Sequence, residues 1–424
     1  MTVVLFVSLF FLFLLGVPIA ISMGAASVIA LLALGGVPLI IVAQRSFTSL
    51  DSFPLMAIPF FILAGTIMEV GGISRRLINL ANAFTGHFVG GIGIVAVITS
   101  LFFSAISGSG AATVAAIGSI LIPAMIARGY DRGFAGAIQS VSGELGIIIP
   151  PSIPLILYGI STGTSISDLF MAGFVPGLLI ALSLLLTAYF IAKKRGYKGM
   201  PKASWSERMK YLKEAVLALF LPVIILGGIY SGIFTPTEAG AVGVLFAFVV
   251  SVLVYKELNI KQLVKLFSKS AVTTSIILYI IANAGLFSWI LTREGIPQKI
   301  GELFIQISDS PIIFLIMANI LLLIFGMFMD TGATVIILAP LLTPIAISMG
   351  IDPVHFGIVM IVNLAMGLCT PPLGVNLFIS CQIANIRLGH ISRALIPFFI
   401  VLIVDLLLIS YIPAISLSMV NLFK

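Results

Sequence analysis

The chain has 424 residues, of which 60% are hydrophobic and only 9% are charged, and its mean hydropathy is +1.25. These values exclude a soluble globular domain and indicate a polytopic membrane protein, because runs of about 20 apolar residues cross a bilayer as helices. The net charge of +7 does not indicate a nucleic-acid-binding protein, since the basic residues are concentrated in short segments between apolar runs.

Candidate membrane spans follow one another along the chain. The first charged residue is Arg45, so residues 3–43 supply two apolar spans. The further candidates are 54–70, 90–128, 132–161, 168–192, 216–232, 236–255, 271–292, 311–349, 352–382 and 394–415. We predict an all-α polytopic membrane fold with about ten transmembrane helices plus two re-entrant hairpins. Three amphipathic stretches are expected to lie in the interface plane as helices: 72–85, 257–268 and 297–306.

An internal repeat relates two parts of the chain. Eleven residues recur 221 positions later, more than the roughly three expected by chance. They are Ala112, Thr113, Val114, Pro123, Gly129, Asp131, Gly136, Val141, Gly146, Pro150 and Pro151, repeated as Ala333, Thr334, Val335, Pro344, Gly350, Asp352, Gly357, Val362, Gly367, Pro371 and Pro372. Repeated Gly/Pro-interrupted apolar segments in two halves of a chain point to the binding site of a secondary transporter.

The two repeats are predicted to have inverted topology. The first linker has Arg128 and Arg132, whereas the matching linker has Met349 and Pro353, so the positive-inside rule places the two on opposite sides. The five spans counted between the linkers are an odd number and give the same result.

The domain prediction follows from this repeat. Residues 1–200 form the first inverted repeat, with scaffold helices, an arm, hairpin 1 and a helix broken near 143–151. Residues 201–215 form a cytoplasmic linker within the basic segment 193–215. Residues 216–424 form the second repeat, with a helix broken near 364–372.

Four breaks interrupt the apolar segments at comparable depth: 107–113, 142–151, 326–334 and 363–372. Prolines and glycines there leave main-chain carbonyl groups without their helical hydrogen bonds. Non-helical backbone of this kind occurs in a membrane only where it lines a cavity or is buried in protein. Carbonyl and hydroxyl oxygens suit Na⁺, and the helix N-termini that follow favour an anion. The alternative for a single motif is that its Ser and Thr bond to their own backbone and its Gly serves close packing.

Carboxylates inside membrane spans indicate function by default. Glu144 and Asp330 lie in the breaks, and Glu238 follows a Thr-Pro-Thr sequence. Glu69 and Asp405 lie nearer span ends and are expected to be structural.

Several other polar residues have simple structural interpretations. Asp131 and Asp352 precede predicted helices and are expected to cap them. Cys369 and Cys381 lie twelve residues apart on one apolar segment, too far for a disulfide if that segment is helical. Neither has a companion at a metal-ligand spacing, so no transition metal is expected.

Five segments, taken together and in this order, resemble the large membrane subunit of TRAP (tripartite ATP-independent periplasmic) transporters, the DctM family. The similarity covers nearly the whole chain and is carried by Ile58–Gly65, Ser107–Thr113, Pro150–Ile153, Thr235–Ala241 and Pro371–Phe378.

The resemblance implies a Na⁺-driven elevator transporter, like members of the ion transporter superfamily, that imports a small organic acid. A periplasmic substrate-binding protein delivers that acid, and a separate small membrane subunit of about four helices completes the membrane part. We therefore expect a protein of the bacterial or archaeal cytoplasmic membrane, surrounded by membrane lipid, that is not an enzyme and needs no cofactor other than Na⁺ as coupling ion. Dicarboxylates, sialic acid and other sugar acids all remain possible substrates.

The resemblance, carried over by position, places the sodium-binding residues in the breaks. They are Ser107, Gly108, Ser109, Gly143 and Glu144 in the first repeat, and Gly326, Asp330, Thr331, Gly332, Ala333, Gly367 and Thr370 in the second. The expected substrate-binding residues are Ser107, Thr113, Pro150, Pro151, Ser152, Thr334, Pro371, Pro372 and Asn376. No Lys or Arg occurs in any break, so a cation for the substrate carboxylate has to come from elsewhere, and Arg293 is one candidate.

Other functions are less compatible with the sequence. The main alternative is a stand-alone dicarboxylate or citrate symporter, coupled to Na⁺ or H⁺, because such symporters are also built from inverted repeats. A channel is a second alternative, because it would show the same breaks. An intramembrane protease would need a catalytic Ser–His pair, paired Asp or a zinc motif, and no His-Glu-x-x-His occurs. An ATPase is excluded because the sequence has no Gly-x-x-x-x-Gly-Lys-Ser/Thr.

Overall fold

The computed structural model describes residues 2–34, 37–299, 302 and 310–423. All regular secondary structure in that part of the chain is helical, which confirms the predicted all-α fold. Nine of these helices are long and apolar enough to cross a membrane. A bent pair, Arg132–Ile148 with Ile153–Thr162, is a tenth candidate if it is counted as one span, and its bend of 41° falls at the end of the predicted break at 142–151.

The first half of the chain runs from the N-terminus to the end of a 30-residue helix. Its elements are α1 (Thr2–Leu14), α2 (Ile19–Leu34), α3 (Ile40–Leu50), the 3₁₀ turn η1 (Phe53–Met56), α4 (Ala57–Val70), α5 (Ile73–Thr85), α6 (Gly91–Ser107), α7 (Gly110–Ala127), α8 (Arg132–Ser142), α9 (Leu145–Ile148), α10 (Ile153–Thr162) and α11 (Ile166–Arg195).

The second half follows a short non-helical segment. Its elements are α12 (Trp205–Tyr230), α13 (Pro236–Phe248), the π-helical turn η2 (Val249–Val254), α14 (Ile260–Arg293), α16 (Pro311–Phe328), α17 (Thr331–Ser348), α18 (Pro353–Gly367), α19 (Val375–Ala384), α20 (Leu388–Tyr411) and α21 (Pro413–Phe423).

The helix bounds follow the spacing of the sequence repeat. Helices α7 and α17 both have 18 residues, and they begin and end 221 residues apart. Each repeat therefore has a helical hairpin, α6–α7 or α16–α17, followed by a broken helix. The peptide bonds Pro150–Pro151 and Pro371–Pro372 are both cis. The inversion of the repeats and their division at 201–215 stay predictions.

The hairpins pack crosswise on the broken helices. Helix α7 of the first hairpin packs against α19, and α17 of the second packs against α10. Since each hairpin is held by the other repeat, the hairpins and broken helices form one packed group.

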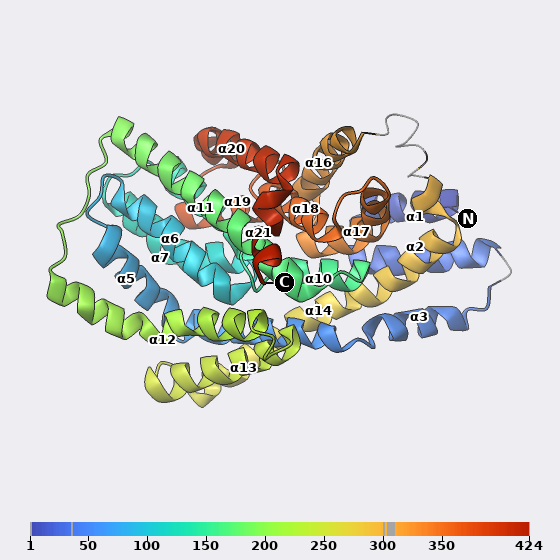
Figure 1. The fold of residues 1–424 in the computed structure, drawn as a ribbon, viewed down its shortest axis with the longest axis horizontal. Coiled ribbons are helices and arrows are strands. Elements are labelled where there is room, and N and C mark those ends of the chain that lie inside the picture. Colours follow the sequence, from blue (N-terminus) through green and yellow to red (C-terminus); the bar gives the residue numbers. More distant parts are fainter. Residues whose placement is uncertain (1, 35–36, 300–301, 303–309, 424) are drawn as a thin grey trace.

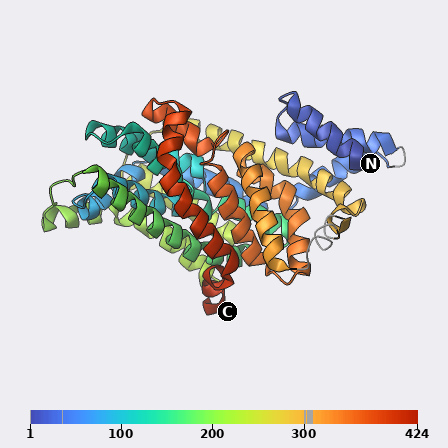
Figure 2. The ribbon, with the colours of Figure 1, turned by 90° about the horizontal axis from the view of Figure 1, so that it is seen from above.

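A second group of helices surrounds this one. Helix α14 packs against α2, α3 and α4, and α13 packs against α4 and α12. Figure 1 shows α3, α12 and α13 along the lower edge of the molecule, with α16, α18 and α20 on the opposite side. Figure 2 shows the N-terminal helices at one end and α21 projecting from the lower edge of that view.

The amphipathic stretches behave differently from one another. Segment 72–85 forms the separate helix α5, whose buried residues pack on α6 and α12. Segment 257–268 is not a separate helix, because α14 continues unbroken from Ile260 to Arg293, starting at a capping box of Asn259 and Gln262. Segment 297–306 lies largely outside the described residues.

Four expectations need correction. The two N-terminal helices have 13 and 16 residues, below the about 20 that a perpendicular crossing needs. Glu238 is not a buried carboxylate, because it is exposed and completes the capping box of α13 with Thr235. The basic linker expected at 193–215 is helical at both ends, because α12 starts at a capping box of Ser204 and Glu207. The two cysteines are free, as predicted, but they do not share a helix, since Cys369 lies in the turn after α18 and Cys381 lies in α19.

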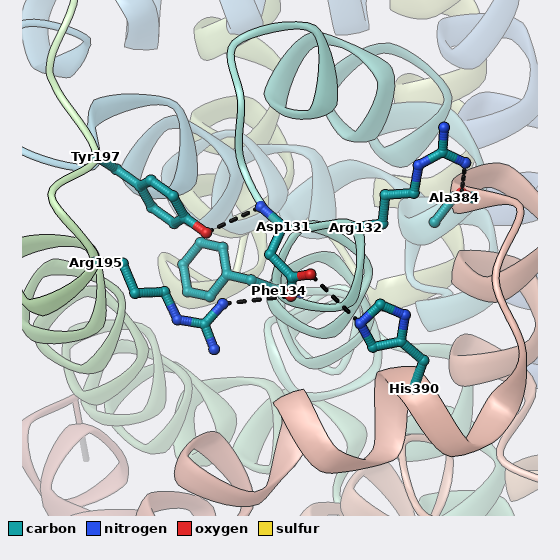
Figure 3. A network of polar contacts seen from close by, with 7 residues as sticks. All are labelled: Asp131, Arg132, Phe134, Arg195, Tyr197, Ala384 and His390. Carbon is teal, nitrogen blue, oxygen red and sulfur yellow. Dashed lines mark hydrogen bonds and ion pairs between the residues drawn. The ribbon is translucent and has the colours of Figure 1, made fainter.

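The caps predicted at Asp131 and Asp352 are confirmed. Figure 3 shows the surroundings of Asp131, whose carboxylate accepts the Phe134 N–H at 2.9 Å and lies 3.3 Å from the Arg195 guanidinium. His390 lies 3.4 Å from the other carboxylate oxygen, and the Asp131 N–H donates to the Tyr197 hydroxyl at 2.9 Å. One carboxylate thus joins the start of α8 to the end of α11 and the start of α20.

Asp131→Asn tests the charge at this junction, because Asn also caps helices. Burial raises the pKa of Asp131, but the Phe134 N–H, His390 and Arg195 together outweigh it and leave the pKa below its ordinary value. Its charge therefore stabilises the fold above a pH of about 4 and loses this effect as the pH falls below that value. We expect Asp131→Asn to lower the unfolding free energy by at most about 1 kcal/mol at pH 7. In thermal unfolding in detergent, a difference from wild type as large at pH 3 as at pH 7 would contradict this.

Candidate functional site

The tip of the first hairpin concentrates oxygen atoms. The Ser107 hydroxyl lies 3.0 Å from the Thr113 hydroxyl, and Thr113 donates to the Ser109 carbonyl oxygen at 2.9 Å. Ser109 caps α7 by accepting the Ala112 N–H at 3.4 Å. Since a hydroxyl that donates one hydrogen bond keeps lone pairs, these oxygens remain able to contact a cation.

The tip of the second hairpin has the same construction with a carboxylate. Asp330 caps α17, and its Oδ1 accepts the N–H groups of Gly332 and Ala333 at 2.9 and 3.4 Å. Thr334 donates to the Asp330 carbonyl oxygen at 2.9 Å, the counterpart of the bond from Thr113 to Ser109. Asp330 is exposed and therefore brings a negative charge to the tip.

The first tip lies directly against the first broken helix. Gly108 has φ +60°, and a Cβ there would lie 2.9 Å from the Pro151 carbonyl oxygen. A Cβ on Gly146 would lie 2.5 Å from the Ser109 carbonyl oxygen. The main chain of the tip can approach the broken helix this closely only because these positions have no side chain.

The second hairpin contacts its own broken helix in a similar way. A Cβ on Gly367 would lie 2.3 Å from the Gly326 carbonyl carbon. Beyond this contact, Thr370 bonds back to the Met366 carbonyl oxygen at 2.7 Å, the ordinary structural role of Thr in an apolar helix. The structure therefore brings both pairs of predicted sodium-site segments together.

Asn376 connects the two repeats. Its buried side chain donates to the Ser140 carbonyl oxygen at 3.4 Å, and its Nδ2 would lie 3.1 Å from a Cβ on Gly143. A residue of the second repeat thus lies at the break of the first. Its Oδ1 has no hydrogen-bond partner among the described residues.

Glu144 is the most unusual polar residue of the site. It is 0% exposed, and neither of its carboxyl oxygens has a hydrogen-bond partner in the described part of the chain. An unpaired carboxylate is costly in an apolar interior, and a cation bound beside it would remove that cost. In the first repeat, these unpaired oxygen atoms are the feature that is compatible with a bound sodium ion.

Two adjoining cavities lie beside the tips. The smaller has a volume of about 130 Å³ and is bordered by both tips, α10 and α14. The larger, of about 430 Å³, is bordered by both tips and by α4 and α14. Ser109 and Asp330 border both cavities, so the two tips face the same space.

The predicted site residues divide into two sets. Those that border a cavity are Ser107, Gly108, Ser109, Asp330, Thr331, Gly332 and Ala333. Those that border neither of the two are Thr113, Gly143, Glu144, Pro150, Pro151, Ser152, Gly326, Thr334, Gly367, Thr370, Pro371, Pro372 and Asn376.

The cavities also have walls that the sequence did not predict. Ile277 and Ile280 of α14 border both cavities, and Lys269 and Glu69 border the larger one. Arg293, the cation considered from the sequence, borders neither cavity and lies over the ring of Trp289 at 5.4 Å. These walls become apparent only in the three-dimensional structure, where α4 and α14 face the same cavity.

Comparison with known proteins identifies the family. The sequence profile of the DctM component of the tripartite ATP-independent periplasmic transporter matches residues 6–415. The chain belongs to the DctM family.

Named relatives agree with this family assignment. The chain is 43% identical to the C4-dicarboxylate TRAP transporter large permease protein DctM of Rhodobacter capsulatus, over 99% of this chain and 98% of that protein. It is 39% identical to the sialic acid TRAP transporter large permease protein SiaM of Vibrio cholerae, over 96% of each.

Two further similarities are more limited. The chain is 45% identical to the isethionate TRAP transporter permease protein DctMQ of Oleidesulfovibrio alaskensis over 95% of its own length, but it spans only 64% of that protein. The crystal structure of the Alcanivorax borkumensis YdaH transporter matches the fold with a TM-score of 0.63 and 15% identity, over 87% of this chain and 86% of that one. At this identity the match concerns the fold alone.

Gly108→Ala tests the contact between the first tip and the broken helix. The new methyl group meets the Pro151 carbonyl oxygen, and overpacking of this kind costs about 1–3 kcal/mol. Gly129→Ala is the matched control, because Gly129 has φ +81° but nothing within 4 Å of a Cβ. We expect the melting temperature in detergent to fall more for Gly108→Ala than for Gly129→Ala, and equal decreases would contradict a close contact.

Proposed function

We propose that this chain is the large membrane subunit of a Na⁺-coupled secondary transporter that imports an organic acid delivered by a periplasmic substrate-binding protein. The observation that carries the proposal is the pair of tips: Ser109 and Asp330, 221 residues apart in the repeat, border one shared space. Membership of the DctM family supports this over a stand-alone symporter without a binding protein.

Sodium would bind at two places, one in each repeat. In the first, the Ser107 hydroxyl and the Ser109 carbonyl oxygen would supply oxygen atoms at the tip, and the unpaired carboxyl of Glu144 would supply a charge in the break that begins beside Gly143. In the second, Asp330 supplies a charge next to the close contact between Gly326 and Gly367. Oxygen ligands of this kind suit a hard cation.

The substrate would lie between the tips, where ion and substrate binding are coupled. A bound Na⁺ fixes the tip segments and adds positive charge, which raises the affinity for an anion. By thermodynamic reciprocity, the anion raises the affinity for Na⁺ by the same factor. The N-termini of α7 and α17, which begin at the tips, favour the same negative charge.

An elevator movement fits the packing. The hairpins and broken helices hold one another crosswise, whereas their boundary with α4 and α14 is partly open at the cavity and closed at contacts such as that of Gly65 with Ser107. We propose that the first group moves as one body against the helices α2, α4 and α14.

The named relatives narrow the substrate class. Their names give C4-dicarboxylates, sialic acid and isethionate, which are all organic anions at neutral pH. We propose an organic acid with at least one carboxylate or sulfonate for this chain. A separate small membrane subunit, a periplasmic binding protein and a location in the cytoplasmic membrane belong to the same proposal.

Ser107→Ala and Asp330→Asn test the sodium sites in vesicles containing the assembled transporter. Each change removes an oxygen ligand or a charge, a loss of about 1–3 kcal/mol, so the half-saturating Na⁺ concentration for uptake should rise at least about fivefold. Asp330→Asn keeps a capping side chain, which separates the loss of charge from loss of the helix cap. Ser119→Ala on the same hairpin is the control, because Ser119 lies away from both cavities and bonds the Ala116 carbonyl oxygen. Sodium titrations identical to wild type for both site variants would refute this assignment.

The dependence on a binding protein separates the proposed function from its main alternative. We expect uptake of a radiolabelled organic acid to require the binding protein, the small subunit and an inward Na⁺ gradient together. Uptake that proceeds at the full rate without the binding protein would support the stand-alone symporter instead. The ligand of the binding protein encoded beside this chain would identify the substrate.

A further inference from the structure

The larger cavity has a charged end that the proposed sodium and substrate sites do not use. Lys269 of α14 lies 3.7 Å from Glu69 of α4, and both border the cavity. The Lys269 side chain is 63% exposed, whereas that of Glu69 is 25% exposed, so Lys269 is the more accessible member of the pair.

The cavity continues from this ion pair to the tips. Lys269 and Ile280 both border it, and they lie eleven positions apart on one helix, a rise of about 16 Å. Thr66 and Thr273, one helical turn further in, add hydroxyl groups to the walls of α4 and α14. Ser107, Ser109 and Asp330 border the same cavity, and Ser107 lies against Gly65, one turn of α4 from Glu69.

The charges along this path are unevenly distributed. Asp330 and Glu69 are the acidic residues that border the cavity, and Lys269 is the one basic residue among its described walls. An organic anion that leaves the tips therefore meets a single cation before it reaches the solvent.

We propose that Lys269 receives the anionic substrate on its way out of the tips and that Glu69 is the carboxylate it exchanges for the substrate. This rests on the proposed function, because it assumes an organic anion at the tips. In the resting state Glu69 neutralises Lys269. When the substrate carboxylate arrives it takes the place of Glu69, and when it leaves the ion pair reforms. Since an exposed ion pair is weak, the exchange retains the substrate only briefly.

The location of the pair indicates the side on which this occurs. Lys269 lies in the basic stretch that begins at Lys256, and Glu69 precedes Arg75 and Arg76. The positive-inside rule places this end in the cytoplasm. Lys269 thus acts at substrate release, and it acts from the helices that surround the hairpins.

The first test measures the charge of the cavity without requiring transport. Thr273→Cys places a thiol one turn from Lys269, and the native Cys369 and Cys381 are buried, so the background is measured without Thr273→Cys. The full complex in inside-out vesicles is treated with an anionic or a cationic methanethiosulfonate reagent. We expect the ratio of anionic to cationic reaction rates to fall about threefold when Lys269→Gln is added, and to rise when Glu69→Gln is added.

Two controls make this result specific. Lys269→Arg should keep the wild-type ratio because it keeps the charge. Lys265→Gln removes the same charge one turn earlier on the same helix, outside the cavity, and should change the ratio less. An equal effect of Lys265→Gln and Lys269→Gln, or a thiol that reacts only in right-side-out vesicles, would overturn the proposal.

The second test concerns transport, with succinate as the probe. In vesicles with the cytoplasmic face outward, Lys269→Gln should raise the half-saturating succinate concentration at that face by about two- to fivefold. The Na⁺ dependence should change little, because Lys269 borders the same cavity as Ser107 and Asp330 but offers no oxygen ligand to either proposed sodium site. If Lys269→Gln transports normally and its half-saturating succinate concentration is unchanged, the proposed role of Lys269 in substrate release is refuted. If no organic acid is transported by the wild-type complex, the proposed function fails, whereas the reagent ratio still decides whether Lys269 attracts anions into this cavity.

Discussion

The candidate site depends on one constraint: the main chain of each hairpin packs directly against the main chain of a broken helix. Gly108 lies against the Pro151 carbonyl and Gly326 lies against Gly367, so the hairpin tips and the broken helices meet without side chains between them. Main-chain carbonyl oxygens of the tip, such as that of Ser109, are thereby held directly beside the broken helix. A side chain at either contact would separate the tip from its broken helix, and the oxygen atoms proposed to share one ion would no longer be neighbours.

Reciprocal packing makes these two sites a single unit. Helix α7 rests on α19, α17 rests on α10, and Asn376 of the second repeat reaches the break beside Gly143 of the first. A displacement of one tip is therefore passed to the other repeat through side chains that are fully buried. This packing meets the mechanical condition for the proposed coupling of two cations to one substrate, since occupation of either proposed site would alter the geometry of both.

The sequence predicted the parts of the site that depend on local chain chemistry. The repeat spacing located both tips, and the bounds of α7 and α17 match it at each end. Asp131 and Asp352 were identified as caps because helix capping is a local interaction. The errors have physical causes as well. Glu238 looked like a membrane carboxylate until its capping box placed it at an exposed helix end. Lys269 escaped notice because its partner, Glu69, lies 200 positions earlier, and no local pattern shows that α4 and α14 face one cavity.

The unbroken course of α14 has a mechanical consequence. One rigid rod of 34 residues carries the basic first turns, the lysine at the cavity and the isoleucines beside the tips. Because a helix transmits axial and rotational shifts along its length, a protein or lipid that tilts the basic end of this rod would reposition the wall next to the proposed ion sites and would thereby alter the turnover rate from outside the proposed transport path.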